Sequence, residues 1–226
     1  MKVSREQRAE HRRRILDAAG RLFRSTGFDA VTVAEVMHAA GLTHGGFYRH
    51  FGSKDDLVAE TMAHVLHRDP DLEFDLPTFV DRYLSSRHRE ATATGCPVAG
   101  LASDTRHQTP PARAALTAGL RAQLDRMSTA MPDPDAVARR RAAIGTWSAM
   151  VGAVILARAI DDRALSDAVL EETRAWIADR THATSAPGRR GRGGRRAEAD
   201  ARTSTTPRRR SAAGAEGSGR GEGGQR

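Results

Sequence analysis

The sequence lacks most features of a secreted or membrane-spanning protein. Cys96 is the only cysteine among the 226 residues, so no intrachain disulfide can form. The N-terminus carries charges without the apolar core of a signal peptide. The longest apolar run, residues 149–157, is far shorter than the ~18 residues that span a bilayer. We therefore expect a soluble, cytoplasmic protein that contacts no membrane.

Motifs for catalysis, cofactor binding and metal binding are also missing. No nucleophile elbow, phosphate-binding loop or catalytic carboxylate pair stands out. Gly219, Gly221 and Gly224 have a dinucleotide-binding spacing, but no strand precedes them and no helix can follow. His64 and His67 have no third strong ligand at a fitting spacing, so solvated or capping histidines are favoured over a metal site. We expect no enzyme, no cofactor and no metal.

The net charge of +8 is concentrated at the two ends of the chain. Residues 181–226 hold 11 Arg and 4 acidic residues, and they contain no aromatic, branched aliphatic or sulfur-containing side chain. Such a segment cannot repay the entropy of ordering, so we expect a disordered tail. Its arginines either bind nucleic acid without sequence preference or are solvated. Residues 1–14 carry a further net charge of +4, which predicts a basic arm for phosphates.

Residues 32–51 have the pattern of two short helices joined by a tight turn, a helix-turn-helix. Thr32 is a suitable N-cap, and apolar residues then recur at the i, i+3, i+4, i+7 spacing of one helix face. Gly41 ends this helix, because glycine readily takes the left-handed backbone of such a turn. Thr43 opens a second helix whose small and polar first residues suit a DNA groove.

This stretch resembles the DNA-binding domain of the TetR/AcrR family of transcriptional regulators, over about residues 1–65. The motif that carries the resemblance comprises Gly41-Leu42-Thr43, Gly45, Phe47-Tyr48, His50-Phe51 and Ser53-Lys54. The expected phosphate contacts come from Thr32, Thr43, Tyr48, His50 and Lys54. The expected base contacts come from His44 and Arg49, with Gly45 and Gly46 letting the backbone approach.

Helical periodicity and proline breaks predict an all-α chain in three parts. These are a DNA-binding domain at 1–68, a helical regulatory and dimerisation domain at 69–180, and the tail at 181–226. Ser4 and Gln7 predict the cap of a first helix that ends near Gly27. A helix over 53–67 follows, which by resemblance links the two domains, and breaks are expected at 69–71, 95–97, 110–111 and 132–134. Cys96, at one break, is interpreted as a small buried thiol rather than a redox sensor.

The resemblance implies that a small molecule binds between residues 77 and 131. The side chains expected around it are Phe79, Tyr83, Leu101, Leu116, Leu120 and Trp147. Because these side chains look apolar, an apolar or aromatic ligand is the natural expectation. The alternative is that they form only a core.

The last two predicted helices, over 135–160 and 165–177, carry apolar residues on more than one face. In TetR-like proteins the last two helices of two subunits form a four-helix interface, and the alternative is the internal core of a monomer. The residues expected in the interface are Ile144, Trp147, Val151, Ile155, Leu165, Val169 and Trp176.

The sequence thus favours a homodimeric, ligand-responsive regulator that binds a near-palindromic operator in double-stranded DNA, and the resemblance implies that it represses transcription. The alternative is an architectural protein that coats nucleic acid without sequence preference through its Arg-rich tail.

Overall fold

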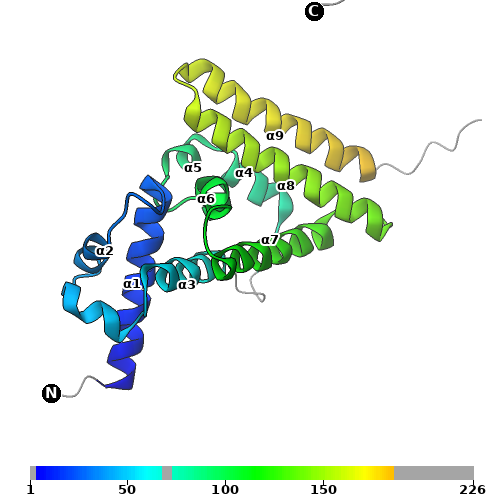
Figure 1. Ribbon diagram of the computed structural model, residues 1–226. Helices are drawn as coiled ribbons and strands as arrows, with labels where there is room; N and C mark the ends of the chain where they lie inside the picture. Colours follow the sequence, from blue (N-terminus) through cyan, green and yellow to red (C-terminus); the bar gives the residue numbers. More distant parts are fainter. Residues whose placement is uncertain (1–3, 68–72, 186–226) are drawn as a thin grey trace, which may run out of the picture. The chain divides into compact units, whose positions relative to one another are not determined.

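The computed structural model describes residues 4–67 and 73–185, and every regular element in these ranges is helical (Figure 1). The predicted all-α class is confirmed for this part of the chain. The predicted break at 69–71 and the tail from residue 186 onward lie outside the described residues. The elements are α1 Arg5–Thr26, α2 Val33–Ala39, η1 His44–Arg49, α3 Lys54–Leu66, α4 Leu76–Tyr83, α5 Ser86–Glu90, α6 Pro97–Thr105, α7 Pro110–Ala130, α8 Ala136–Ala159 and α9 Arg163–Ser185.

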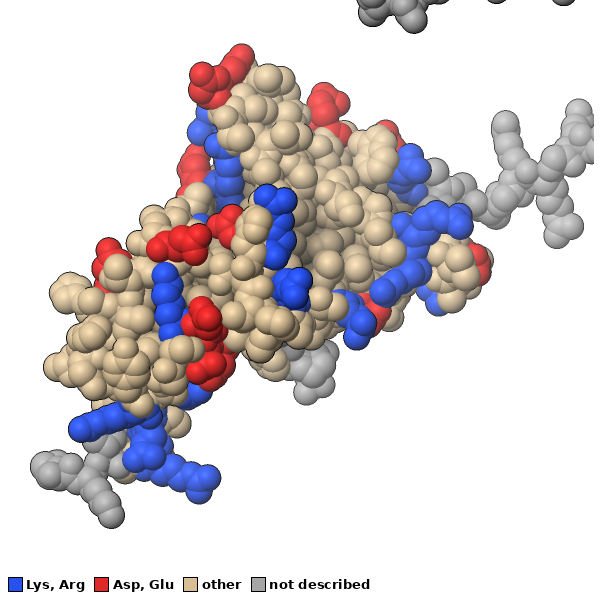
Figure 2. All heavy atoms as spheres, in the orientation of Figure 1, with Lys and Arg blue, Asp and Glu red and all other residues tan. Residues whose placement is uncertain are grey.

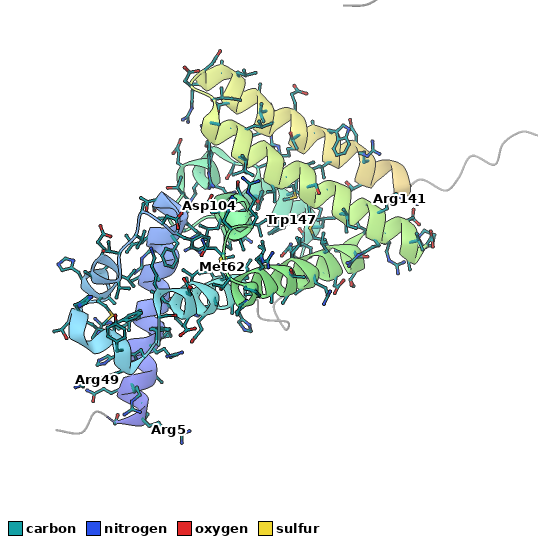
Figure 3. All side chains as sticks on the ribbon, viewed as in Figure 1. Arg5, Arg49, Met62, Asp104, Arg141 and Trp147 are labelled. Atoms are coloured by element: carbon teal, nitrogen blue, oxygen red, sulfur yellow. The ribbon has the colours of Figure 1, made fainter. Side chains whose placement is uncertain are left out.

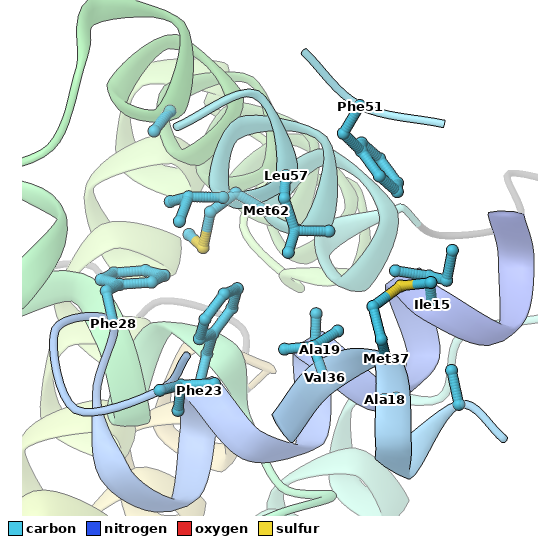
Figure 4. Close-up of a cluster of buried hydrophobic side chains, with 14 of the residues drawn as sticks. Ile15, Ala18, Ala19, Phe23, Phe28, Val36, Met37, Phe51, Leu57 and Met62 are labelled. Carbon is cyan, nitrogen blue, oxygen red and sulfur yellow. The ribbon is translucent and has the colours of Figure 1, made fainter. Parts of the chain in front are cut away.

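The first hydrophobic cluster holds α1, α2, η1 and α3 together (Figure 4). Ile15 and Phe23 of α1 face Leu57 and Met62 of α3, and all four side chains are fully buried. Leu101 of α6 belongs to the same cluster. The packing of the N-terminal helices therefore crosses the predicted boundary at residue 68.

Helix α3 approaches two neighbours at glycines. A Cβ atom added to Gly20 of α1 would lie 2.6 Å from a methyl of Val65. One added to Gly119 of α7 would lie 2.6 Å from Cβ of Leu66. Since real Cβ atoms do not come so close, α3 sits nearer to α1 and α7 than any larger residue at these two positions would allow.

The second hydrophobic cluster lies among α4, α7, α8 and α9. Met127 of α7, Met150 and Val154 of α8 and Ile177 of α9 are buried in it. Helix α8 is long and apolar enough to cross a membrane, although its longest uninterrupted apolar run is short. This is weak evidence for a membrane span, because buried helices of ordinary protein cores have the same composition.

Two predicted boundaries were wrong. No break was expected between residues 71 and 95, but this segment is split into α4 and α5, because Ser85 caps a new helix by accepting a hydrogen bond from His88 N at 3.2 Å. The last helix was expected to end near Ile177, but α9 continues to Ser185. Residues 181–185, assigned to the tail, are thus helical, and Thr181 donates its hydroxyl proton back to Ile177 O at 3.1 Å.

The helix-turn-helix forms where the sequence predicts it. Thr32 and Glu35 make a reciprocal capping box at the start of α2: Glu35 N donates to the Thr32 hydroxyl at 3.2 Å, and Thr32 N donates to the Glu35 carboxylate at 2.7 Å. Gly41 has φ of 68° and turns the chain. The second helix opens after Thr43 as expected, but it is the 3-10 helix η1 rather than an α-helix.

We predict that Gly41→Ala lowers the free energy of unfolding by about 1–2 kcal/mol, because a side chain with a Cβ strains the left-handed backbone. Gly41→Asn should lose less, since asparagine tolerates this conformation better. Both variants place a Cβ near the Arg14 guanidinium, so their difference isolates the backbone effect. Urea denaturation followed by circular dichroism measures both, and equal losses would contradict the explanation.

Candidate nucleic-acid interface

The outer face of η1 is exposed while its inner face is anchored. Phe47 and Phe51 are 1% and 3% exposed, and their rings stack with centroids 5.6 Å apart. Tyr48, between them in sequence, is 72% exposed. His44 and Arg49 are exposed as well. The buried pair thus fixes a short helix whose polar side faces solvent, the arrangement of an element that reads a groove.

A basic cluster lies where η1 meets the start of α1. His50 is flanked by Arg8, His11, Arg12 and Arg49, and its pKa is lowered first by burial and then by these neighbouring charges. Figure 2 shows basic side chains gathered around the N-terminal end of α1, and Figure 3 places Arg5 and Arg49 there. The lowered pKa keeps the His50 ring neutral near neutral pH, so it would meet a phosphate as a hydrogen-bond partner rather than as a cation.

The predicted basic arm is instead the first turns of α1, because Ser4 caps the helix by accepting a hydrogen bond from Gln7 N at 3.1 Å. Three of its arginines are engaged by other residues of the chain. Arg12 lies over the Phe51 ring, 4.4 Å from its centroid, and binds the His50 carbonyl and Glu60.

Arg14 donates to the Ala40 carbonyl, and Arg13 pairs with Glu10 at 2.9 Å. Within the described part of this segment, only Arg5 and Arg8 form no ion pair and donate no side-chain hydrogen bond. Arg8 was not among the predicted contacts. Its only signal in the sequence was membership of the basic run, and folding is what brings it to His50.

The remaining predicted contacts lie around this face. Thr43 and Gly45 are exposed, and Gly46 is half-buried. Thr32 is exposed, although its hydroxyl is already occupied in the capping box. The Lys54 ammonium donates to the Asp29 carbonyl at 3.4 Å, a long and exposed hydrogen bond that leaves donors available.

Three of the six residues predicted to contact a small molecule lie together around a cavity of about 370 Å³. Phe79, Tyr83 and Trp147 line it. The other half does not reach it: Leu101 and Leu116 pack in the first cluster, and Leu120 packs against the second. The missed lining residues come mainly from α5 and the α5–α6 connection, and they are Arg82, Ser85, Arg87, His88, Ala91, Thr94, Gly95 and Cys96. The cavity thus combines the expected apolar side chains with a polar wall that the sequence did not indicate.

His88 connects the elements of the polar wall through two hydrogen bonds. Its Nε2 accepts from Cys96 N at 2.9 Å, so its Nδ1 carries the proton and donates to the Tyr83 carbonyl at 2.7 Å. Burial lowers the pKa of His88, which favours this neutral form. His64, weighed above as a metal ligand, instead contacts Asp17 at 2.7 Å. No group of three or more potential metal ligands occurs in the part of the chain that the structure describes.

The predicted interface residues divide between the surface and the interior. Exposed apolar side chains form a stripe along α8 and α9, comprising Ile144, Ile155, Leu165 and Trp176. Val151 and Val169 lie half-buried against the second cluster. Trp147 is buried within one chain and faces the cavity, because its position on α8 points toward α4.

Comparison with known proteins assigns the N-terminal residues. Residues 15–61 match the family described as bacterial regulatory proteins, tetR family. The chain is 39% identical over 75 residues to an HTH-type transcriptional repressor of Mycobacterium tuberculosis, covering 30% of this chain and 40% of that protein. It is 40% identical over 57 residues to the regulator AcrR of Shigella flexneri, and this match covers 25% of this chain and 26% of AcrR. The matches thus span less than half the length of these relatives.

Solved structures match far more of the chain, at low identity. A TetR-family regulator from Agrobacterium tumefaciens aligns with a TM-score of 0.62 and 18% identity, over 76% of this chain and 98% of the other. Reduced NemR of Escherichia coli aligns with a TM-score of 0.59 and 18% identity, over 75% of this chain and 95% of NemR. At such identities the likeness establishes the fold.

We predict that Arg49→Ala changes which base is preferred at one position of each bound half-site, at a cost of ~1–3 kcal/mol for the original base. The reason is that Arg49 is exposed on η1 beside a neutral His50, which leaves its guanidinium free for a two-pronged contact. Sequencing of DNA selected by each variant measures the preference.

Lys54→Ala is the matched comparison. It should weaken all DNA sequences alike and lower the salt slope of binding by about one unit, as expected for a phosphate contact. An unchanged selected sequence for Arg49→Ala would refute the base-reading role.

Proposed function

We propose that this chain, whose residues 15–61 match the tetR family of bacterial regulatory proteins and whose fold is that of a solved TetR-family regulator, is a ligand-responsive transcriptional repressor. The observation that carries the proposal is the exposed face of η1, held in place by the buried Phe47 and Phe51. A rigid anchor beneath exposed donors is what sequence-specific reading requires. The curated relatives are regulators rather than enzymes, which supports a role in DNA binding.

We propose that two chains bind a near-palindromic operator together. The apolar stripe along α8 and α9 supports this, since monomers rarely expose so many large apolar side chains on one face. A hollow of about 540 Å³ is lined by Arg141 and Gly145 of α8 and by Trp176 and Arg180 of α9. The two helices thus present one continuous surface, which a second copy could cover by two-fold symmetry.

The third element of the proposal is that a small molecule releases the protein from its operator. The cavity behind Tyr83 and Trp147 has a volume in the range of small-molecule sites. Helix α3 packs closely on α7 at Gly119 and on α1 at Gly20. A ligand that displaces the helices around α7 would therefore act on α1 through a stiff contact, and we propose this as the route to the reading face. The chain would act in the cytoplasm, where operator DNA lies.

Selection of bound sequences from random DNA by the purified protein tests the proposal. We expect a near-palindrome that is preferred by ~10³-fold or more over unrelated DNA. A variant lacking residues 186–226 serves as the control, since α9 ends at Ser185 and stays whole. It should retain most of the preference. If both proteins bind all sequences alike, or if the preference disappears with the tail, an architectural role replaces the repressor.

We predict that Ile155→Arg lowers both dimer affinity and operator affinity, because it would bury an unpaired charge in the interface. Ile155 is 44% exposed in one chain, so the monomer can accommodate the arginine. The control is Ala118→Arg, at an exposed position of α7. Sedimentation equilibrium and DNA titration measure the two affinities. A folded Ile155→Arg protein that remains a tight dimer would place the interface elsewhere.

A further inference from the structure

We infer that the cavity behind Tyr83 and Trp147 selects an organic acid, with the acid group held by the polar wall and an apolar body held by the aromatic wall. This rests on the proposed ligand response and specifies the chemical class of the ligand. The chemistry of the lining carries the inference in three steps.

The first step is a pair of buried donors that lack a strong acceptor. Tyr83 and Trp147 are each 6% exposed, and both line the cavity. The Trp147 indole nitrogen has no hydrogen-bond partner, and the Tyr83 hydroxyl has only the weakly accepting Cys96 thiol beside it. An indole N–H can only donate. Burial raises the pKa of Tyr83 well above its usual value, so its hydroxyl also keeps a proton to donate. Buried donors normally have partners, and a ligand rich in acceptors would supply them.

The second step is the charge of the lining. Arg82 and Arg87 line the cavity, and neither forms an ion pair or donates a side-chain hydrogen bond among the described residues. No aspartate or glutamate contributes to the lining. His88 is neutral, and its Nε2 is already occupied by Cys96 N. The site therefore offers cations and donors without a competing anion.

The acidic residues of the neighbouring helices do not compensate these cations. Asp81, the acid within α4, faces Arg174 at 4.0 Å. Glu90, the acid within α5, pairs with Arg163 at 2.9 Å. Both carboxylates are thus committed to arginines outside the cavity lining, which leaves Arg82 and Arg87 available for a carboxylate from solution.

The third step is the aromatic wall. The rings of Phe79 and Trp147 stack with centroids 6.1 Å apart and planes 21° from parallel. The Tyr83 ring lies 5.3 Å from that of Trp147. These faces favour an apolar body, aromatic or aliphatic, and they lie beside the buried donors of the same residues. A neutral hydrocarbon would leave those donors without a strong acceptor, and a cation would meet two arginines. An acid with an apolar body can pair with the arginines of the polar wall and pack against the aromatic wall.

The test compares acids with their own neutral amides. Benzoate, naphthoate and decanoate are titrated into the full-length protein by calorimetry, each beside its primary amide. We expect at least one acid to bind tenfold or more tightly than its amide. Arg82→Gln with Arg87→Gln should abolish that preference, and Tyr83→Phe should reduce it. Arg121→Gln, at an exposed position on α7, should leave it unchanged.

Melting temperatures without ligand show whether the variants fold, and the exposed Arg82 and Arg87 can be replaced without disturbing the core. The inference is overturned if no acid exceeds its amide, or if the preference survives in the double variant. An acid that binds with the expected preference but never alters operator affinity would refute the ligand response and leave the ligand class intact. If the amides release the operator and the acids do not, the ligand response stands and the inferred ligand class is refuted.

Discussion

The close packing of α3 against both α1 and α7 is the constraint on which the rest of this protein depends. At Gly20 and Gly119 the neighbouring helix occupies the space of a missing side chain. Tight packing of this kind transmits displacement instead of absorbing it. Helix α3, which follows η1 in the chain, therefore also borders the C-terminal half. The two hydrophobic clusters are consequently parts of one mechanical unit, even though the sequence divides them into two domains.

The local features of the fold could be predicted because their causes are local. Ser4, Thr32 and Ser53 cap helices through hydrogen bonds that reach three residues along the chain, and Gly41 turns it through its own backbone. The split at Ser85 and the end of α9 were missed. The cap at Ser85 is equally local, but its polar neighbours suit a continuous helix as well as a helix start, and the residues at the end of α9 suit a helix and a loop equally well.

The candidate sites were predicted less completely, since they join residues that are distant in sequence. The motif located the exposed face of η1, but it gave no sign that Arg12 is held by Phe51 and Glu60. Phe79, Tyr83 and Trp147 were found because aromatic residues on helices usually point inward. Arg82 and Arg87 escaped notice because an arginine on an amphipathic helix normally faces water.

The 3-10 geometry of η1 sets the length of the proposed reading element. A 3-10 helix rises ~2.0 Å per residue, against ~1.5 Å in an α-helix. The 6 residues of η1 therefore extend over about 12 Å, where an α-helix of equal length would cover about 9 Å. The difference is close to the ~3.4 Å that separates successive nucleotides along a DNA strand. A short element thus gains about one base-pair step of reach from its winding alone.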